Sequence, residues 1–464
     1  MTDPSQDRLA QLSRRQLLRT LGGGLGLLGL SPLALARQAT EGLHHAPRAR
    51  RVIFLCMAGA PSHVDTFDHK PALARDDGKS PSGNIDTRRG ARLMRSPFQF
   101  SQHGESGLWI SELFPELARH ADKLCMLHGM HTEVPVHASA FLHLHTGSTR
   151  FVRPSMGAWT LQGLGSANEN LPGFVTLNPP SGQGGAQNYG SAFLPAATQG
   201  MRLGIERESR VLRRDDTGPI PDLANRRLGP DAQRRQLELT RALNERFQKR
   251  GGNERISQGI DDSYQLAFRM QSELPAVLDL SAEDEATLER YGIGQDSTDS
   301  FGRQCLHALR LAEAGVRFVE VGQGGWDHHR DLRENLTESC AGIDRPIAAL
   351  LEDLQRTGLL EDTLVLWGGE FGRTPYAQGN DGRDHNHLGF TTWMAGGGVK
   401  GGFAHGATDE HGIEAVEGRM SIHDWHATVL HLLGIDHEQL TYPYAGRDFR
   451  LTDVHGFVAR DILA

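Results

Sequence analysis

Unbroken apolar runs, rather than alternating apolar and polar residues, mark the strands that this sequence predicts. The first run, residues 51–57, reads RVIFLCM and ends in the loop sequence AGAP. Runs of the same kind occupy residues 123–128, 316–321, 363–367 and 390–394. Strands that are apolar on both faces are typical of parallel sheets covered by helices on each side. The pattern therefore predicts a parallel sheet.

Helical segments separate several of these runs. The segment 301–314 ends at Gly315, another ends near Arg356, and each precedes a predicted strand. This alternation is the rhythm of βαβ units. Residues 161–230 are rich in Gly, Pro, Asn and Ser, which predicts loops or a cap over the sheet. The segment 231–248 carries an apolar residue every four positions among charges, which predicts an amphipathic helix.

The first 36 residues predict an export signal rather than part of the fold. Arg14 and Arg15 precede a short apolar stretch, residues 21–30, and Ala34-Leu35-Ala36 supplies small residues for cleavage. The stretch is about half the length that a bilayer-spanning helix needs, although a retained anchor is an alternative. We expect export by the twin-arginine translocase, a mature domain of residues 37–464 with no stable membrane span, and a periplasmic or secreted location.

Composition and charge exclude several classes of protein. With 38% hydrophobic residues and 55 glycines, about half of the 464 residues are apolar, as in soluble globular proteins. The net charge is −8 and the chain has no dense basic run, so a nucleic-acid partner is not expected. The four cysteines form no CxxC pair and are interpreted as buried thiols.

Polar clusters that include many of the 23 histidines follow the predicted strands. They are Gly322 to His329, Gly368 to Arg373 and Arg383 to His387. Because loops at the carboxyl ends of parallel strands meet in one crevice, these clusters are expected to converge. Carboxylates with imidazoles suit Zn, Mn or Fe, so we expect a divalent metal site, with Zn or Mn favoured and one or two ions. Each cluster alone also fits a plainer explanation, such as a polar turn, a Glu370–Arg373 ion pair or a solvated loop.

A further histidine group surrounds Pro135. Because His137, His143 and His145 are spaced at i, i+6 and i+8, some of them must face away from any one site. Most of this group is therefore interpreted as structural or surface histidines, and only His137 is kept as a candidate. Its other members are His128 and His131.

Taken together, these motifs resemble the DUF1501 family of secreted proteins, itself similar to the alkaline phosphatase and sulfatase superfamily. The matching pieces are GAPSHVDTFD from Gly59, GGWDHH from Gly324, WGGEFGR from Trp367, GRDH from Gly382, AGGG from Ala395, ATDE from Ala407 and GRDFRL from Gly446. The resemblance implies a doubly wound, mostly parallel α/β sheet with helices on both faces.

The resemblance also implies residue roles. Asp327, His329 and His385 resemble the ligands of one metal. Glu370 falls where the acid of a second metal should be, with Phe371 where a nitrogen or amide ligand should stand. Asp65 is the acid nearest the first strand, and Asp68 is its rival.

The nucleophile position falls on His137 instead of Ser, Thr or Cys, while Ser139 stands two residues away. Hydrolysis by metal-activated water, covalent attack by His137 and loss of activity all stay open. Arg373 and Arg383 are candidates for contacts with anionic oxygens or for surface salt bridges. We therefore expect a metal-dependent hydrolase of an anionic small-molecule or polysaccharide ester, either phosphate or sulfate, or alternatively a non-catalytic periplasmic binding or assembly protein on the same fold.

Overall fold

The computed structural model describes residues 43–81, 91–180, 182–204, 227–251 and 254–464. The predicted export signal, residues 1–36, lies outside the described residues, as does part of the loop-rich segment 161–230. Among the described residues, no helix combines the length and apolarity that a bilayer crossing requires.

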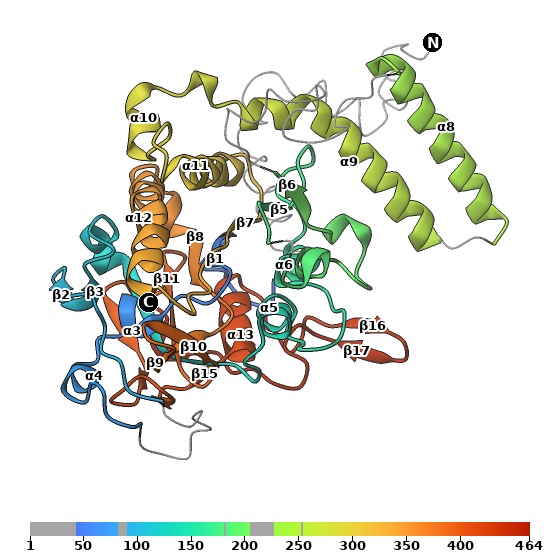
Figure 1. Ribbon diagram of the computed structural model, residues 1–464. Helices are drawn as coiled ribbons and strands as arrows, with labels where there is room; N and C mark the ends of the chain where they lie inside the picture. Colours follow the sequence, from blue (N-terminus) through green and yellow to red (C-terminus); the bar gives the residue numbers. More distant parts are fainter. Residues whose placement is uncertain (1–42, 82–90, 181, 205–226, 252–253) are drawn as a thin grey trace, which may run out of the picture. The chain divides into compact units, whose positions relative to one another are not determined.

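Nine strands of the described chain form one sheet in the order β12-β4-β11-β8-β1-β7-β5-β6, with β15 also paired to β4. Their bounds are β1 Arg51–Met57, β4 Leu124–His131, β5 Phe174–Leu177, β6 Met201–Leu203, β7 Phe318–Gln323, β8 Thr363–Gly368, β11 Phe390–Ala395, β12 Phe403–His405 and β15 Met420–Ser421. In Figure 1, β1 lies between its parallel neighbours β7 and β8. Only β11 runs antiparallel to its neighbours, so the predicted mostly parallel sheet is confirmed.

Helices cover both faces of this sheet. The evidence is that alternate residues of β1 pack in two different apolar clusters. Ile53, Leu55 and Met57 pack in a cluster with residues of α11 (Asp299–Glu313) and α12 (Leu332–Arg356). Val52, Phe54 and Cys56 pack in the other cluster. It includes residues of α5 (His137–Thr146), α6 (Met156–Leu164) and α13 (Ile422–Leu432). The doubly wound arrangement expected from the sequence is therefore present.

The segment 161–230 is not only loop. Its residues Phe174–Leu177 and Met201–Leu203 form β5 and β6, which extend the sheet beside β7. The predicted amphipathic helix is α8, Pro230–Lys249, which pairs with α9, Glu254–Leu278. The apolar stripe of this helix predicted a buried face. The structure instead exposes its residues Leu239, Leu243 and Phe247.

Smaller elements complete the described chain. The short α-helices are α3 His63–Thr66, α4 Pro71–Arg75 and α10 Glu285–Arg290, and the two-stranded sheets are β2 Phe100–His103 with β3 Leu108–Ser111, β9 Gly372–Gln378 with β10 Gly382–Asn386, β13 Ala407–Thr408 with β14 Ala415–Glu417, and β16 Tyr442–Tyr444 with β17 Arg447–Phe449. The 3-10 helices are Leu117–Lys123, Gly185–Tyr189, Ala196–Thr198, Leu280–Ala282, Leu359–Glu361 and Arg460–Ile462. The β9–β10 hairpin stands outside the main sheet and contributes to the site described next.

Candidate metal centre

The centre lies where the carboxyl end of β7, the β9–β10 hairpin and the start of α5 meet. Asp327 and His329 belong to the loop that follows β7, and His385 lies on β10. His137 is the first residue of α5. Segments far apart in sequence thus deliver four polar side chains to one place, as the strand-end rule predicts for a parallel sheet.

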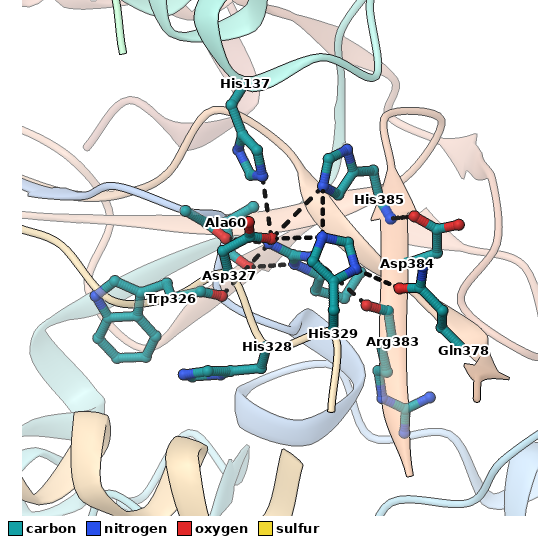
Figure 2. A network of polar contacts seen from close by, with 12 residues as sticks. Ala60, His137, Trp326, Asp327, His328, His329, Gln378, Arg383, Asp384 and His385 are labelled. Carbon is teal, nitrogen blue, oxygen red and sulfur yellow. Dashed lines mark hydrogen bonds and ion pairs between the residues drawn. The ribbon is translucent and has the colours of Figure 1, made fainter. Parts of the chain in front are cut away.

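Three imidazoles converge on one carboxylate oxygen. Asp327 Oδ1 lies 3.1 Å from His137 Nε2, 2.8 Å from His329 Nε2 and 3.5 Å from His385 Nε2. Figure 2 shows these rings directed toward Asp327, while His328 points away. The four groups each offer a ligand atom within 4.8 Å of the others, which is the reach of a single cation.

The outer nitrogen of each ring fixes where its proton lies. His137 Nδ1 donates to Glu370 Oε1 at 2.6 Å, and His329 Nδ1 donates to Gln378 Oε1. His385 Nδ1 donates to the Pro135 carbonyl at 2.7 Å. With a proton on each Nδ1, the three Nε2 atoms face inward toward Asp327, the arrangement that supporting hydrogen bonds impose on metal-binding histidines.

A positive charge between the inward nitrogens would satisfy them. His385 Nε2 and His329 Nε2 are 3.1 Å apart, where two lone pairs would repel each other. His137 Nε2 is buried and faces the Asp327 carboxylate oxygen at 3.1 Å. A divalent ion fits both observations, and imidazoles with one carboxylate form a donor set for Zn, Mn or Fe rather than Ca or Mg.

Arg373 balances the charge of the carboxylate. Its side chain is fully buried, and its guanidinium donates to Asp327 Oδ1 at 2.5 Å and to the carbonyls of Gly59 and Ala60. Partial burial alone would raise the pKa of Asp327, but hydrogen bonds with His137 and His385 and the Arg373 charge hold that pKa well below its usual range. Burial alone would lower the pKa of His137, but Asp327 and Glu370 raise it to about 9. The two carboxylates therefore favour the protonated form of the His137 ring.

Comparison with known proteins places the sequence in a family. The model of the family described as "Protein of unknown function (DUF1501)" matches residues 49–463. The chain belongs to the DUF1501 family. The family expected from its sequence motifs is thereby confirmed. No curated protein matches the sequence.

Several solved structures are similar to this DUF1501 protein. The PsFucS1 sulfatase from Pseudoalteromonas sp. is 12% identical with a TM-score of 0.38, covering 100% of this chain and 77% of its own. The TAB5 alkaline phosphatase with Mg bound is 12% identical with a TM-score of 0.33, covering 75% and 92%. The periplasmic domain of EcEptC from Escherichia coli in complex with Zn is 9% identical with a TM-score of 0.35, covering 84% and 85%.

The structure does not bring Asp65 into the centre. Its carboxylate lies in α3 and receives two hydrogen bonds from Arg383, at 2.6 and 3.0 Å, and one from the Ser62 hydroxyl at 2.5 Å. Asp65 and Arg383 are both fully buried. The rival Asp68 pairs with Lys70 at 3.0 Å. The expectation of surface salt bridges for the two arginines is wrong, because Arg373 and Arg383 are both buried.

Glu370 supports His137 and is not part of the group of possible ligands around Asp327. It is fully buried and accepts from the Gly59 amide at 3.1 Å as well as from His137. Phe371 packs its ring 4.8 Å from the rings of His137 and His385. Phe371 thus forms an aromatic wall beside the two rings, and the described residues here gather ligands for one ion.

The sequence analysis assigned no role at the centre to three of its contributors. Gln378 and the Pro135 carbonyl carry no recognisable signal, because one is an ordinary strand residue and the other a backbone atom. Gly59 does carry one. Its φ is +111°, and a Cβ there would lie 2.8 Å from the Asp327 amide nitrogen, so the glycine of the loop after β1 is required by close approach.

Proposed function

We propose that this protein is an exported metal-dependent hydrolase of a phosphate or sulfate ester. The observation that carries the proposal is the convergence of three imidazole Nε2 atoms on the Asp327 carboxylate. Asp327, His329 and His385 would hold one ion, zinc or manganese, because three protein ligands leave a position open for substrate or water. The ion would supply Lewis-acid polarisation and a water of lowered pKa.

His137 is assigned the proton transfer because its acceptor differs from those of the other two rings. Its Nδ1 hydrogen bonds to the carboxylate of Glu370, whereas His329 and His385 donate to a neutral amide and a carbonyl. A carboxylate partner makes the ring more basic and holds its orientation. The Nε2–H of His137 would donate its proton to the oxygen of the leaving alcohol, and the nitrogen would take a proton back from the attacking water.

The substrate would reach the centre from solvent. The Asp327 side chain is 44% exposed and that of His329 is 35% exposed, which admits an anionic small-molecule or polysaccharide ester. Arg373 has protein acceptors for its donors and is fully buried, so in this proposal it positions Asp327 rather than contacting the ester.

Metal analysis and hydrolysis of aryl phosphates and sulfates by the full chain test the proposal. We expect about one equivalent of transition metal in the wild type, its loss in Asp327→Ala, and its retention in the exposed control Asp448→Ala. His137→Gln should keep the metal and lose about 10²- to 10⁴-fold in hydrolysis rate. The proposal would be refuted if the wild type held less than about half an equivalent of metal. It would also be refuted if Asp327→Ala hydrolysed the esters as fast as the wild type.

The alternative is a non-catalytic periplasmic binding or assembly protein, and Phe371 beside the centre favours it. Bound metal without hydrolysis of any tested ester would support that alternative against the hydrolase. Export by the twin-arginine translocase is part of the proposal and rests on the paired arginines. Replacing Arg14 and Arg15 by lysine should keep the protein in the cytoplasm, and undiminished export would contradict that route.

A further inference from the structure

A second group of metal-ligating side chains lies outside the centre. His143 lies on α5, His423 lies near the start of α13, and Glu133 follows β4. Each offers one ligand atom, and the three atoms lie within 4.8 Å of one another. None of these residues contributes to the centre around Asp327.

The hydrogen bonds of each ring engage only one of its two nitrogens. His423 Nε2 donates to the Gly147 carbonyl at 2.9 Å, and because a carbonyl only accepts, the bare nitrogen of His423 is Nδ1. His143 Nδ1 is bonded to the Thr132 hydroxyl at 2.9 Å, while its Nε2 is buried without a partner. Both rings thus have the outer support that metal-binding histidines receive in proteins.

The unpartnered Nε2 of His143 is energetically costly because the side chain is buried. His143 is 1% exposed, and a buried polar atom with no partner costs about 1–3 kcal/mol. The ring of His423 lies 4.8 Å from that of His143 and 4.9 Å from that of His455. Burial, and then the neighbouring His423, lowers the pKa of His143 to about 3, so its ring is neutral. Glu133, the third member of the group, is exposed.

We propose that Glu133, His143 and His423 bind a second divalent transition-metal ion, of the zinc class. Two imidazoles and a carboxylate are a zinc-type donor set, and three protein ligands leave the fourth position to water. The ion joins α5 to α13, two helices that cover the same face of the sheet. The inference does not depend on the proposed hydrolase activity.

The test separates the two sites by counting zinc in the full chain. After dialysis against Zn²⁺, we expect two equivalents in the wild type and one in the double variant His329→Ala/His385→Ala. In that double variant, the further change Glu133→Gln should weaken the remaining ion at least tenfold in a titration, because a neutral amide replaces the anionic ligand. The exposed control Glu105→Gln should leave it unchanged.

Glu133 is chosen because it is exposed, so its loss does not endanger folding. A folded double variant that holds no zinc, or a Glu133→Gln change that leaves zinc affinity unaltered, would overturn the second site. A wild type that holds one equivalent, kept in the double variant and weakened by Glu133→Gln, would support the second site while removing the centre from the proposed function.

Discussion

Replacement of Asp65 by asparagine separates a structural role from a metal-binding one. The Asp65 carboxylate and the Arg383 guanidinium form a fully buried pair joined by two hydrogen bonds. The amide of asparagine cannot balance the cation, and Arg383 would keep only its bonds to the carbonyls of Thr374 and Met94. We therefore expect a loss of stability with the metal content unchanged.

The size of the loss follows from burial. Removing one partner of a buried ion pair costs about 3–5 kcal/mol, because the other charge stays desolvated. With an m value of about 3 kcal/mol per molar urea, the unfolding midpoint falls by about 1 to 1.7 M. Because the two residues share one interaction, Asp65→Asn combined with Arg383→Gln should cost less than the sum of the single changes.

Equilibrium urea unfolding and metal analysis of the same preparations provide the measurement. The exposed change Asp448→Asn serves as the control and should leave the midpoint within error. An Asp65→Asn protein with the wild-type midpoint would refute the reasoning about burial. A folded Asp65→Asn protein that has lost its metal would instead show that Asp65 is a metal ligand.

Further predictions concern groups that support the site. Gln378→Ala should weaken metal binding about 10- to 100-fold, because it frees the His329 ring, and unchanged affinity would deny that support. Gly382→Ala places a Cβ 1.9 Å from the His329 carbonyl, so the ligand must move and metal affinity should fall; affinity equal to that of the wild type would show that the backbone adapts. Burial alone would lower the pKa of His145, but its ion pair with Glu320, at 3.2 Å, raises it above 6.5. The stability from this pair should be complete below about pH 6.5 and be lost as the pH rises through the raised pKa, so the stability difference from His145→Gln should shrink at high pH, and a constant difference would contradict the pairing.

The sheet was largely predictable because its strands are buried on both faces. The runs at residues 51–57 and 363–367 coincide with β1 and much of β8. β5 and β6 were not predicted, because strands of four and three residues among glycines and prolines are too short to show an apolar pattern. The antiparallel direction of β11 is set by its pairing, and an apolar run carries no direction.

The candidate site was partly predictable for a similar reason. Asp327, His329 and His385 follow predicted strands or lie beside them, and the structure brings them together with His137. The ion pair of Asp65 with Arg383 could not be predicted from the sequence. The two residues are 318 positions apart, and their contact depends on how the β9–β10 hairpin packs.

The β9–β10 hairpin is a short continuous segment that can be exchanged as a unit between related proteins. Arg373 and His385 face each other across its two strands, and Gln378 and Arg383 lie between them in sequence. A chimera that exchanges residues 372–386 as one block transfers this whole set at once. A crossover inside the block would unite halves from different parents, and any mismatch between them would fall on the contacts of Arg373, Gln378 and His385.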